Sequence, residues 1–560
     1  MGKAMFFFGA VGGGTRIKLA VNMVMGTMLA SLGEGLSLTA AAGIEAKLLL
    51  EVLDLGAMAC PLFKLKGPKM LSSDYAPAFP LKHAEKDVKL AVALGQSLGL
   101  GLPIAAKAGT AMRAAIAQGL GDYDFAAVYE AQQKIPLAAG VAPATAASNG
   151  MLPPFASADD AFESFDSTSV CYINAASRTP LPKRTLEVGL AAVRRKAETP
   201  WDIGDTEAQK DEVRALFATL LPGSSADDIA MVPSCSYAMS MAAHNFVATM
   251  RARPPSHRKV LVLHDQNPSN VMQWQQLCDD EGGVLHVIER PDDADWARAV
   301  CAALEDGSIA IAALPPCHWC DGSLVDLAPI SAACRRAKCA LVVDATQWLG
   351  AGPPIDVVAL GIDFLACSIH KWLLGPYGGC LCYASPRFWQ TAAPLEQHDR
   401  NREGAQHVEC LPMGARGFPT PFMRGARRLD GGGRPSFIVL PMLLTSLKLL
   451  VHDLGVERLS AWLSTYTGEV ARRAALLGFT APAKHAPGIV GLRPGVGLPD
   501  AATIVRRLKD ISPRPVLVSE RFGAIRVAPH IYNTSEDLEC LMRGLRVAVT
   551  GEGAPRVSRL

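Results

Sequence analysis

Apolar residues in the first quarter of the chain recur at intervals of three and four positions. The spacing is clear in KLAVNMVMGTMLASLGEGLSL and again in EKDVKLAVALGQSLGL, with almost no alternation of β-branched residues. Because an α-helix has 3.6 residues per turn, this spacing gathers apolar side chains on one helical face. The pattern predicts an all-α domain over residues 1–132. Residues 133–160 are rich in Pro, Ala, Ser and Gly without periodicity, which predicts a linker.

Short apolar runs alternate with helical stretches after this linker. KVLVLHD, IAIAALP and CALVVDA are such runs, and the alternation is typical of βα units around a mostly parallel sheet. We therefore expect a large α/β domain over residues 161–440. The pattern over residues 441–550 predicts a smaller α+β domain that begins with an amphipathic helix at 440–451. The start of the large α/β domain can contribute to this smaller domain.

The charge balance and the cysteines narrow the class of protein. The 560 residues include 55 basic and 53 acidic side chains, a net charge of +2, which argues against a nucleic-acid-binding protein. The uncharged run at 19–33 is shorter than the roughly 20 apolar residues of a membrane span, so no membrane span is expected. Fourteen scattered cysteines suit a reducing compartment. We expect a cytoplasmic protein, and leave organelle targeting open because the N-terminus looks truncated.

The most informative segment is LVVDATQWLGAGPPIDVVALGIDFLACSIHKWLLGPYGG, residues 341–379. Its ordered polar residues are Asp344, Gln347, Ser368, His370 and Lys371. This set resembles class V aminotransferase-type enzymes of pyridoxal phosphate fold type I, and the resemblance covers roughly residues 165–550. It implies a pyridoxal phosphate cofactor and an amino acid substrate.

The residue types fit that chemistry. A lysine amine can bond to the cofactor aldehyde and later move the substrate proton, so Lys371 is the expected catalytic lysine. A carboxylate beside the pyridine nitrogen keeps it protonated, which suits Asp344. Gln347 is expected to donate to the phenolic oxygen of the cofactor. His370 and Ser368 are expected to contact its phosphate or the bonded lysine.

A phosphate is expected where a strand leads into a helix, because free N–H groups and the helix dipole face the anion there. MVPSCSYAMSMAAHN, residues 231–245, has this form. It resembles the small-hydroxyl loop of the family, with Cys235 at a position often held by a hydroxyl residue and Ser236 retained. Both are expected to bind the cofactor, although Ser234 or Ser236 can equally cap the helix.

Substrate contacts are expected near both ends of the second half. SERFGAIRVAPHIYNT resembles the strand whose arginine binds the substrate carboxylate, which assigns Arg526. YINAASRTPLP resembles another pocket segment and points to Asn174. LDGGGRPSF, residues 429–437, resembles a loop that reaches the neighbouring cofactor phosphate, so a homodimer is expected. Residues 505–525 contain no cysteine, so desulfurase activity is expected to be absent.

Cys317 and Cys320 have C-x-x-C spacing, but no second cysteine pair has metal-site spacing. We therefore predict no metal site. The segment IAALPPCHWCDGSLVDL resembles the strand and loop of the family that approach the cofactor, which makes His318 and Trp319 pocket candidates.

The start of the chain, GAVGGGTRIKLAVNM, has a glycine-rich helix start with Lys18 and Asn22 four residues apart, on one helical face. Residues 1–132 resemble the C-terminal helical domain of β-hydroxyacid dehydrogenases, which is 6-phosphogluconate dehydrogenase-like, closest to glyoxylate/succinic semialdehyde reductases. The resemblance makes Lys18 the catalytic proton donor and Asn22 a substrate-binding residue. NADP would bind only if the missing Rossmann domain is supplied, so this chain alone is expected not to reduce glyoxylate.

Three interpretations remain open at this stage. The leading one is a pyridoxal phosphate enzyme acting on the α-carbon of an amino acid, by transamination, lyase or epimerase chemistry, with a remnant reductase domain. The second is a bifunctional NADP-dependent reductase and aminotransferase. The third is a non-enzymatic oligomerisation scaffold.

Overall fold

The computed structural model separates the chain into two compact units, Met1–Ala146 and Ala147–Leu560, each described below by itself. The structure describes residues 6–133 and 161–550, apart from positions 10, 43, 163, 164, 167, 168, 203, 205, 406, 407, 409, 434 and 435. Residues 134–160 of the predicted linker therefore lie outside the described part, as do two residues of the loop 429–437.

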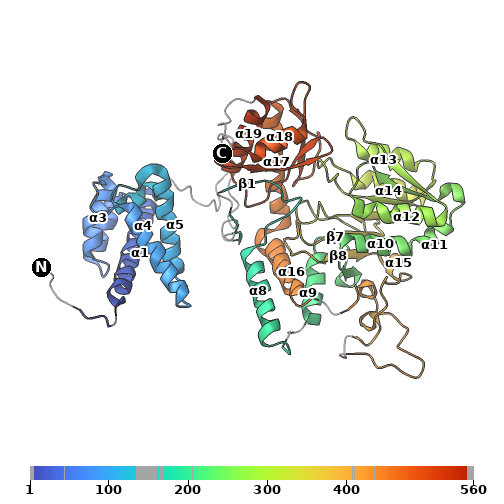
Figure 1. The fold of residues 1–560 in the computed structure, drawn as a ribbon, viewed down its shortest axis with the longest axis horizontal. Coiled ribbons are helices and arrows are strands. Elements are labelled where there is room, and N and C mark those ends of the chain that lie inside the picture. The colour runs from blue at the N-terminus through green and yellow to red at the C-terminus, as the bar shows by residue number, and fades with distance from the viewer. Residues whose placement is uncertain are drawn as a thin grey trace, which may run out of the picture. The chain divides into compact units, whose positions relative to one another are not determined.

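The first unit is helical, as its periodicity predicts (Figure 1). Long apolar side chains of α1 such as Leu29 and Leu36 are fully buried in one core together with Met112 of α5. Helix α1 packs against α4 and α5, which accounts for its apolar spacing. The helices are α1 Gly13–Ala41, α2 Ala46–Leu55, α3 Pro61–Ser72, α4 Leu81–Ser97, α5 Pro103–Ala115 and α6 Val128–Gln133, with a π-helix at Ile116–Leu120 and a 3-10 turn at Phe125–Ala127.

Helix α1 is long and apolar enough to cross a membrane by length and composition alone, with a mean hydropathy of 1.3 over its most apolar window. A third of that window is buried, and core helices of helical bundles pass the same test. The burial of Leu29, Leu32 and Leu36 against other helices favours the bundle interpretation.

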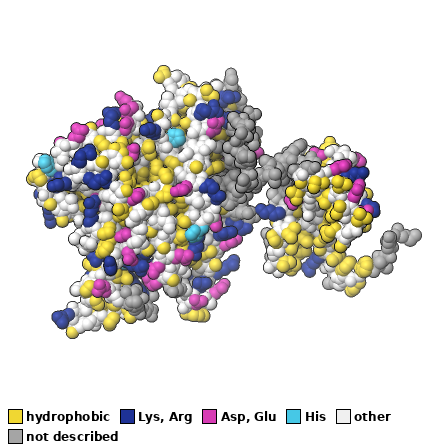
Figure 2. Space-filling model, turned by 180° about the vertical axis from the view of Figure 1, so that it is seen from behind, with side chains coloured by type: hydrophobic (Ala, Val, Ile, Leu, Met, Phe, Trp, Pro, Cys, Tyr) yellow, Lys and Arg dark blue, Asp and Glu magenta, His cyan; other side chains and the backbone are white. Residues whose placement is uncertain are grey.

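The surface of this unit carries many apolar side chains. Val21, Val52 and Leu55 are 58%, 66% and 90% exposed. Figure 2 shows hydrophobic side chains spread over the face of the unit in view. Exposed apolar surface of this kind is typical of regions that contact another protein.

The second unit is built on a seven-stranded sheet in the order β2-β8-β7-β6-β5-β3-β4. The five strands from β7 to β4 are parallel, whereas β8 runs antiparallel to both β7 and β2. The strands are β2 Ile229–Val232, β3 Lys259–Leu263, β4 Val284–Ile288, β5 Ile309–Leu314, β6 Ala340–Asp344, β7 Phe364–Ser368 and β8 Cys380–Ala384.

Alternate residues of these strands pack into two different cores. Leu341 and Val343 of β6 belong to one, and Val342 between them belongs to the other. Because both faces are buried, the strands read as continuous apolar runs. The helices of this part are α8 Lys183–Glu198, α9 Thr206–Ala218, α10 Cys235–Asn245, α11 Val247–Arg251, α12 Met272–Glu281, α13 Trp296–Leu304, α14 Leu327–Ala337, α15 Pro386–Trp389 and α16 Val439–Lys448.

A smaller antiparallel sheet follows, in the order β12-β13-β10-β9. A parallel pair, β1 Cys171–Tyr172 and β11 Val516–Leu517, ties the start of the unit to it. Helix α16 packs into the core of the large sheet, and α17 contributes buried residues to the smaller core only from Tyr466 onward. The remaining elements are β9 Phe479–Thr480, β10 Val490–Pro494, β12 Ser519–Arg521, β13 Ala524–Val527, α17 Val456–Ala475, α18 Ala501–Lys509 and α19 Ser535–Thr550.

Lys and Arg side chains are interspersed with Asp and Glu over the face of this unit in view, rather than gathered in one basic patch (Figure 2).

Candidate active site

A cavity of about 200 Å³ lies where the parallel strands end. Strands β3, β5, β6 and β7 each lead into residues that line it, and α10 begins at it. Carboxyl ends of neighbouring parallel strands meet at one edge of a sheet, where ligands usually bind in α/β folds. The lining residues are Cys235, Gln266, Asn267, Ser269, Pro315, Cys317, Trp319, Asp344, Thr346, Gln347, Ser368, His370 and Lys371.

Lys371 and Asp344 share this cavity. Asp344 is the last residue of β6 and is 8% exposed, and Lys371 follows β7 by three residues. Burial lowers the pKa of Lys371, the charge of Asp344 opposes the shift, and the charge of Arg526 adds to it. A lowered pKa leaves more of the amine neutral and able to act as a nucleophile.

Thr346 holds the two strand ends in register. Its backbone N–H donates to Asp344 Oδ1 at 3.0 Å, and its hydroxyl accepts from the N–H of Ser368 at 3.1 Å. The carboxylate is thereby fixed relative to β7. Thr346 was not singled out from the sequence, because a short hydroxyl side chain between Asp344 and Gln347 has no pattern that distinguishes it from a turn residue.

The amide of Gln347 is held at both ends. Its Nε2 donates to Ala176 O at 3.0 Å, and its Oε1 accepts from the indole N–H of Trp372 at 2.9 Å. One of its two N–H groups remains for a ligand.

His370 stacks on Tyr377, with 4.3 Å between ring centroids. Burial, with a contribution from Lys371, lowers the pKa of His370 to about 4, so its ring is neutral near pH 7. Ser368 ends β7 and is 7% exposed.

The two residues predicted to bind phosphate at the start of α10 differ in their position relative to the cavity. Cys235 is buried and lines the cavity, whereas Ser236 is exposed and does not. The hydroxyl of Ser234 caps the helix by accepting from the N–H of Tyr237 at 3.1 Å. Ser236 lies 3.1 Å from Ser234, Oγ to Oγ.

Arg526 on β13 contacts Trp319, which is a residue of the cavity wall. It is 1% exposed, and its Nη1 donates to Trp319 O at 2.9 Å. Its Nη2 donates to Ser177 Oγ, and Ser177 contacts Ser519, whose hydroxyl donates to Asn174 Oδ1 at 2.6 Å. Arg526 and Asn174 are thus connected to each other, but neither lines the cavity itself. Ser177 was not singled out from the sequence.

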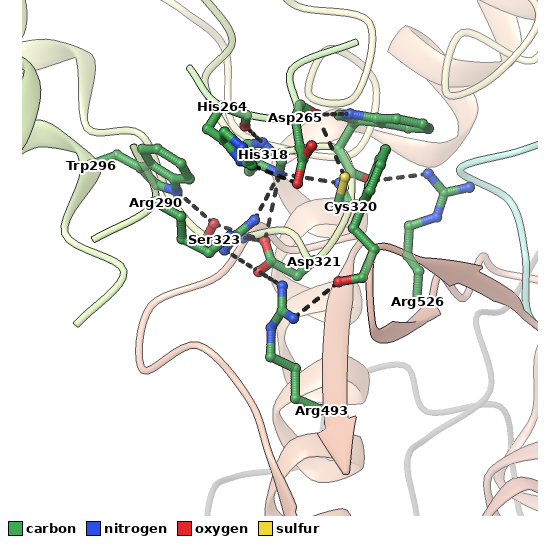
Figure 3. Close-up of polar contacts among 12 residues, drawn as sticks. His264, Asp265, Arg290, Trp296, His318, Cys320, Asp321, Ser323, Arg493 and Arg526 are labelled. Atoms are coloured by element: carbon green, nitrogen blue, oxygen red, sulfur yellow. Dashed lines mark hydrogen bonds and ion pairs between the residues drawn. The ribbon is translucent and has the colours of Figure 1, made fainter. Parts of the chain in front are cut away.

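A polar network anchors the loop that carries Trp319 (Figure 3). His318 is fully buried, stacks on Trp296, and lies 3.3 Å from the guanidinium of Arg290, Nδ1 to Nη2. Arg290 donates to Asp321 at 2.6 Å, and Arg493 of β10 approaches the same carboxylate. Of the two pocket candidates in this loop, Trp319 lines the cavity and His318 supports the loop from behind.

The sulfur atoms of the C-x-x-C pair point to backbone carbonyls. Cys317 Sγ donates to Gln347 O, and Cys320 Sγ donates to Asp265 O. Burial raises the pKa of both thiols. Within the described residues, no group of three His, Cys, Asp or Glu side chains is arranged to hold a metal ion.

In the helical unit, Lys18 and Asn22 lie one turn apart on α1. Asn22 donates to Asp87 Oδ2 of α4 at 2.7 Å, and Asp87 is 4% exposed. The side chain of Lys18 is exposed.

Two family models match the chain. Residues 12–132 match the one described as NAD-binding of NADP-dependent 3-hydroxyisobutyrate dehydrogenase, and residues 184–409 match class-V aminotransferase. Glyoxylate/succinic semialdehyde reductase 1 of Arabidopsis thaliana is 51% identical over 131 residues, which are 23% of this chain and 45% of that protein. The chain therefore spans less than half the length of this relative.

Solved structures show the fold of the second unit. Apo cysteine desulfurase from Thermococcus onnurineus NA1 is 18% identical with a TM-score of 0.57, over 68% of this chain and 95% of that one. A C-DES mutant with glycine covalently linked to the PLP cofactor is 19% identical with a TM-score of 0.58, over 69% and 98%. The second unit has the α/β fold of these proteins.

Proposed function

The chain joins a class-V aminotransferase domain to an NAD-binding 3-hydroxyisobutyrate dehydrogenase-like domain, and we propose that its second unit is a pyridoxal phosphate enzyme acting on the α-carbon of an amino acid. The observation that carries this proposal is the placement of Lys371, with its lowered pKa, and buried Asp344 on one cavity at the strand ends.

The donor set of the cavity fits the cofactor. It offers an amine with a lowered pKa, a buried carboxylate, an amide with an unused N–H, and a helix N-terminus. When bound, the cofactor supplies an aldehyde that bonds to an amine and a pyridine ring that draws electrons from the substrate α-carbon.

Each side chain has a role in the proposal. Lys371 Nζ would hold the cofactor, and its amine would move the proton of the substrate α-carbon. Asp344 holds a proton on the pyridine nitrogen, and Gln347 donates its remaining N–H to the phenolic oxygen. Ser368 and His370 border the cofactor phosphate or the bonded lysine.

The N-terminus of α10 is proposed to bind the phosphate. Free N–H groups at Cys235 and Ser236 and the helix dipole favour an anion there. For the substrate carboxylate we assign Arg526, supported by Asn174 through Ser177 and Ser519.

Replacement of Lys371 tests the proposal. Lys371→Ala is expected to abolish the long-wavelength absorbance band that lysine-bound pyridoxal phosphate gives, because no amine remains in the cavity. Far-UV circular dichroism should be unchanged. Lys509→Ala, at an exposed lysine ending α18, is the matched control and should retain the band. A band unchanged in Lys371→Ala would refute the assignment.

Transferase, lyase or epimerase chemistry is proposed in preference to desulfuration. The cysteines that line the cavity, Cys235 and Cys317, are both buried, and their pKa values are raised, so neither presents a thiolate. A side-chain contact with Cys380 and burial raise the pKa of Cys235, and burial raises the pKa of Cys317. Release of sulfide from the free amino acid cysteine would contradict this, if Cys235→Ser or Cys317→Ser abolishes that release.

A second candidate activity belongs to the helical unit. We propose that this unit adopts the 6-phosphogluconate dehydrogenase C-terminal-like arrangement, and its 51% identity to a reductase over 131 residues supports carbonyl reduction with NADPH, in which Lys18 gives the proton and Asn22 holds the substrate. Because the match covers 45% of that reductase, this chain by itself is expected to consume no NADPH with glyoxylate. Consumption that Lys18→Ala abolishes would contradict this expectation and establish the activity. Consumption unaffected by Lys18→Ala would assign the unit a non-catalytic role.

We also propose that the protein is a homodimer and that it is located in the cytoplasm, a reducing compartment. Exposed apolar side chains of the helical unit support association. All fourteen cysteines are free thiols, which suits reducing conditions. Sedimentation of a catalytically competent monomer would count against the dimer.

A further inference from the structure

One face of the hairpin β12–β13 carries two arginines. The strands are antiparallel, with Ser519 opposite Arg526 and Arg521 opposite Ala524. Cross-strand partners project to the same side of a sheet, and residues two apart on one strand share a face. Arg521 and Arg526 are therefore diagonal neighbours on one face, with roughly 7–8 Å between their Cα atoms by the usual strand geometry.

Both guanidinium groups lie against the same indole. The Cζ atom of Arg521 is 5.5 Å, and that of Arg526 5.8 Å, from the ring centroid of Trp319. Trp319 lines the cavity, and its indole N–H donates to Asp265 O at 2.7 Å. The two positive charges thus lie against a residue of the cavity wall, although neither arginine lines the cavity itself.

Protein carboxylates do not neutralise these charges. Among the described residues, neither Arg521 nor Arg526 forms an ion pair, and Nε of each is buried without a hydrogen-bond partner. Within the described part of the chain, the Arg521 side chain donates to its neighbour's carbonyl, Glu520 O, and Arg526 donates to Trp319 O and Ser177 Oγ.

Nearby acidic side chains have other partners. Asp321 accepts from Arg290 at 2.6 Å, and Asp265 lies 3.3 Å from His264 (Figure 3). Burial and the charge of Arg521 together lower the pKa of Arg526 to about 10, so the guanidinium stays charged near pH 7. Two like charges brought together and partly desolvated are costly unless an anion compensates them.

We infer that this face binds a substrate with two acidic groups, its α-carboxylate at Arg526 and a second carboxylate at Arg521. The substrate class is an acidic amino acid or the corresponding dicarboxylic oxo acid. The α-carboxylate assignment rests on the proposed function, whereas the preference for a second acidic group rests on Arg521. A planar guanidinium offers two parallel N–H groups to each carboxylate, which a lysine does not.

Calorimetric titration of the full chain with glutarate and pentanoate tests the inference, because the two acids share a five-carbon chain and differ by one carboxylate. Wild-type protein should bind glutarate at least tenfold more tightly than pentanoate. Arg521→Gln should remove this preference and leave pentanoate affinity unchanged, while Arg521→Lys should restore part of it. Arg546→Gln, at an exposed arginine of α19, should change neither affinity.

Equal affinities for the two acids in wild-type protein would overturn the inference. So would an Arg521→Gln variant that weakens both acids alike, since that is the result of a merely structural role. Inorganic phosphate that competes as well as glutarate would show a single-anion site and overturn the two-group assignment.

Titrations with and without pyridoxal phosphate separate this inference from the proposed function. A preference for glutarate without the absorbance band of bound cofactor would contradict only the proposed function. The absorbance band without that preference would contradict only the present inference.

Discussion

At the scale of single residues, the helical unit contains a buried ion pair between Lys66 and Asp124. Lys66 Nζ lies 2.7 Å from Asp124 Oδ2, with side chains 6% and 0% exposed. Asp124 also accepts from the N–H groups of Phe79 and Ala126. Burial by itself would raise the pKa of Asp124, but Lys66 and these N–H groups outweigh it and lower the pKa below 3.8.

Asp124→Asn is expected to lower the free energy of unfolding of this unit by about 3–5 kcal/mol, because it leaves a buried ammonium without its partner. The folded pKa is depressed, so the stabilisation is present above pH 3.8 and is lost as the pH falls through the folded pKa. Denaturant titration between pH 7 and 3 measures both effects. Asp122→Asn, at a fully exposed carboxylate that pairs with Lys82, is the control and should change little.

His318 predicts a second acid-sensitive contribution. Burial lowers its pKa to about 4 against 6.5 in an unfolded chain, although Asp321 and Asp265 oppose the shift and Arg290 reinforces it. The unfolded state therefore binds the extra proton, and stability should fall by about 3 kcal/mol as the pH drops from 6.5 through 4. His318→Gln should flatten the pH dependence of unfolding of the second unit between pH 7.5 and 4. An identical slope in both proteins would contradict this.

At the scale of elements, the loop that carries Trp319 depends on close contact with β10. A Cβ atom on Gly491 would lie 2.3 Å from Asp321 Cβ, and the N–H of Gly491 donates to Asp321 O at 2.8 Å. Only glycine permits this approach.

Gly491→Ala is expected to push the loop from β10 and to cost about 1–3 kcal/mol, as overpacking does. Gly468→Ala is the matched control, because a Cβ there meets nothing within 4 Å and the residue lies inside α17. That change should stabilise the protein by roughly 0.5–1 kcal/mol through helix propensity. Thermal unfolding of both variants decides the matter, and equal effects would show that the contact does not constrain the loop.

At the scale of the whole molecule, each unit has its own core. The core of the helical unit contains Leu29, Val88 and Met112 and no residue beyond Tyr129, whereas the sheet cores begin at Phe162 and Cys171 within the described residues.

Leu29→Ala should therefore cost about 2–5 kcal/mol in the helical unit, by loss of buried area and the cavity left behind. Hydrogen exchange resolved along the chain should show faster exchange in residues 13–133 and no change in residues 161–550. Faster exchange in both units would show that they unfold as one.

Local pattern predicted the elements well. Strand runs such as 259–263 and 340–344 read directly from the sequence because both faces of the sheet are buried and every position is apolar except Lys259 at the start of one run and Asp344 at the end of the other. The motif order likewise predicted that Asp344 and Lys371 lie together, and both line one cavity because they end and follow neighbouring strands. Thr346 and Ser177 were not found, since a short hydroxyl side chain has no pattern that distinguishes a site from a turn.

The sequence by itself determined the helical and α/β classes of the two units and the chemistry available at 344–371, because periodicity and residue type are local properties. Tertiary structure alone decided which distant segments share the cavity. The strand order β2-β8-β7-β6-β5-β3-β4 brings Cys235, Asn267 and Trp319 to Lys371, and the hairpin β12–β13 sets Arg521 beside Arg526. Strand order and hairpin placement follow from long-range packing, which no local pattern contains.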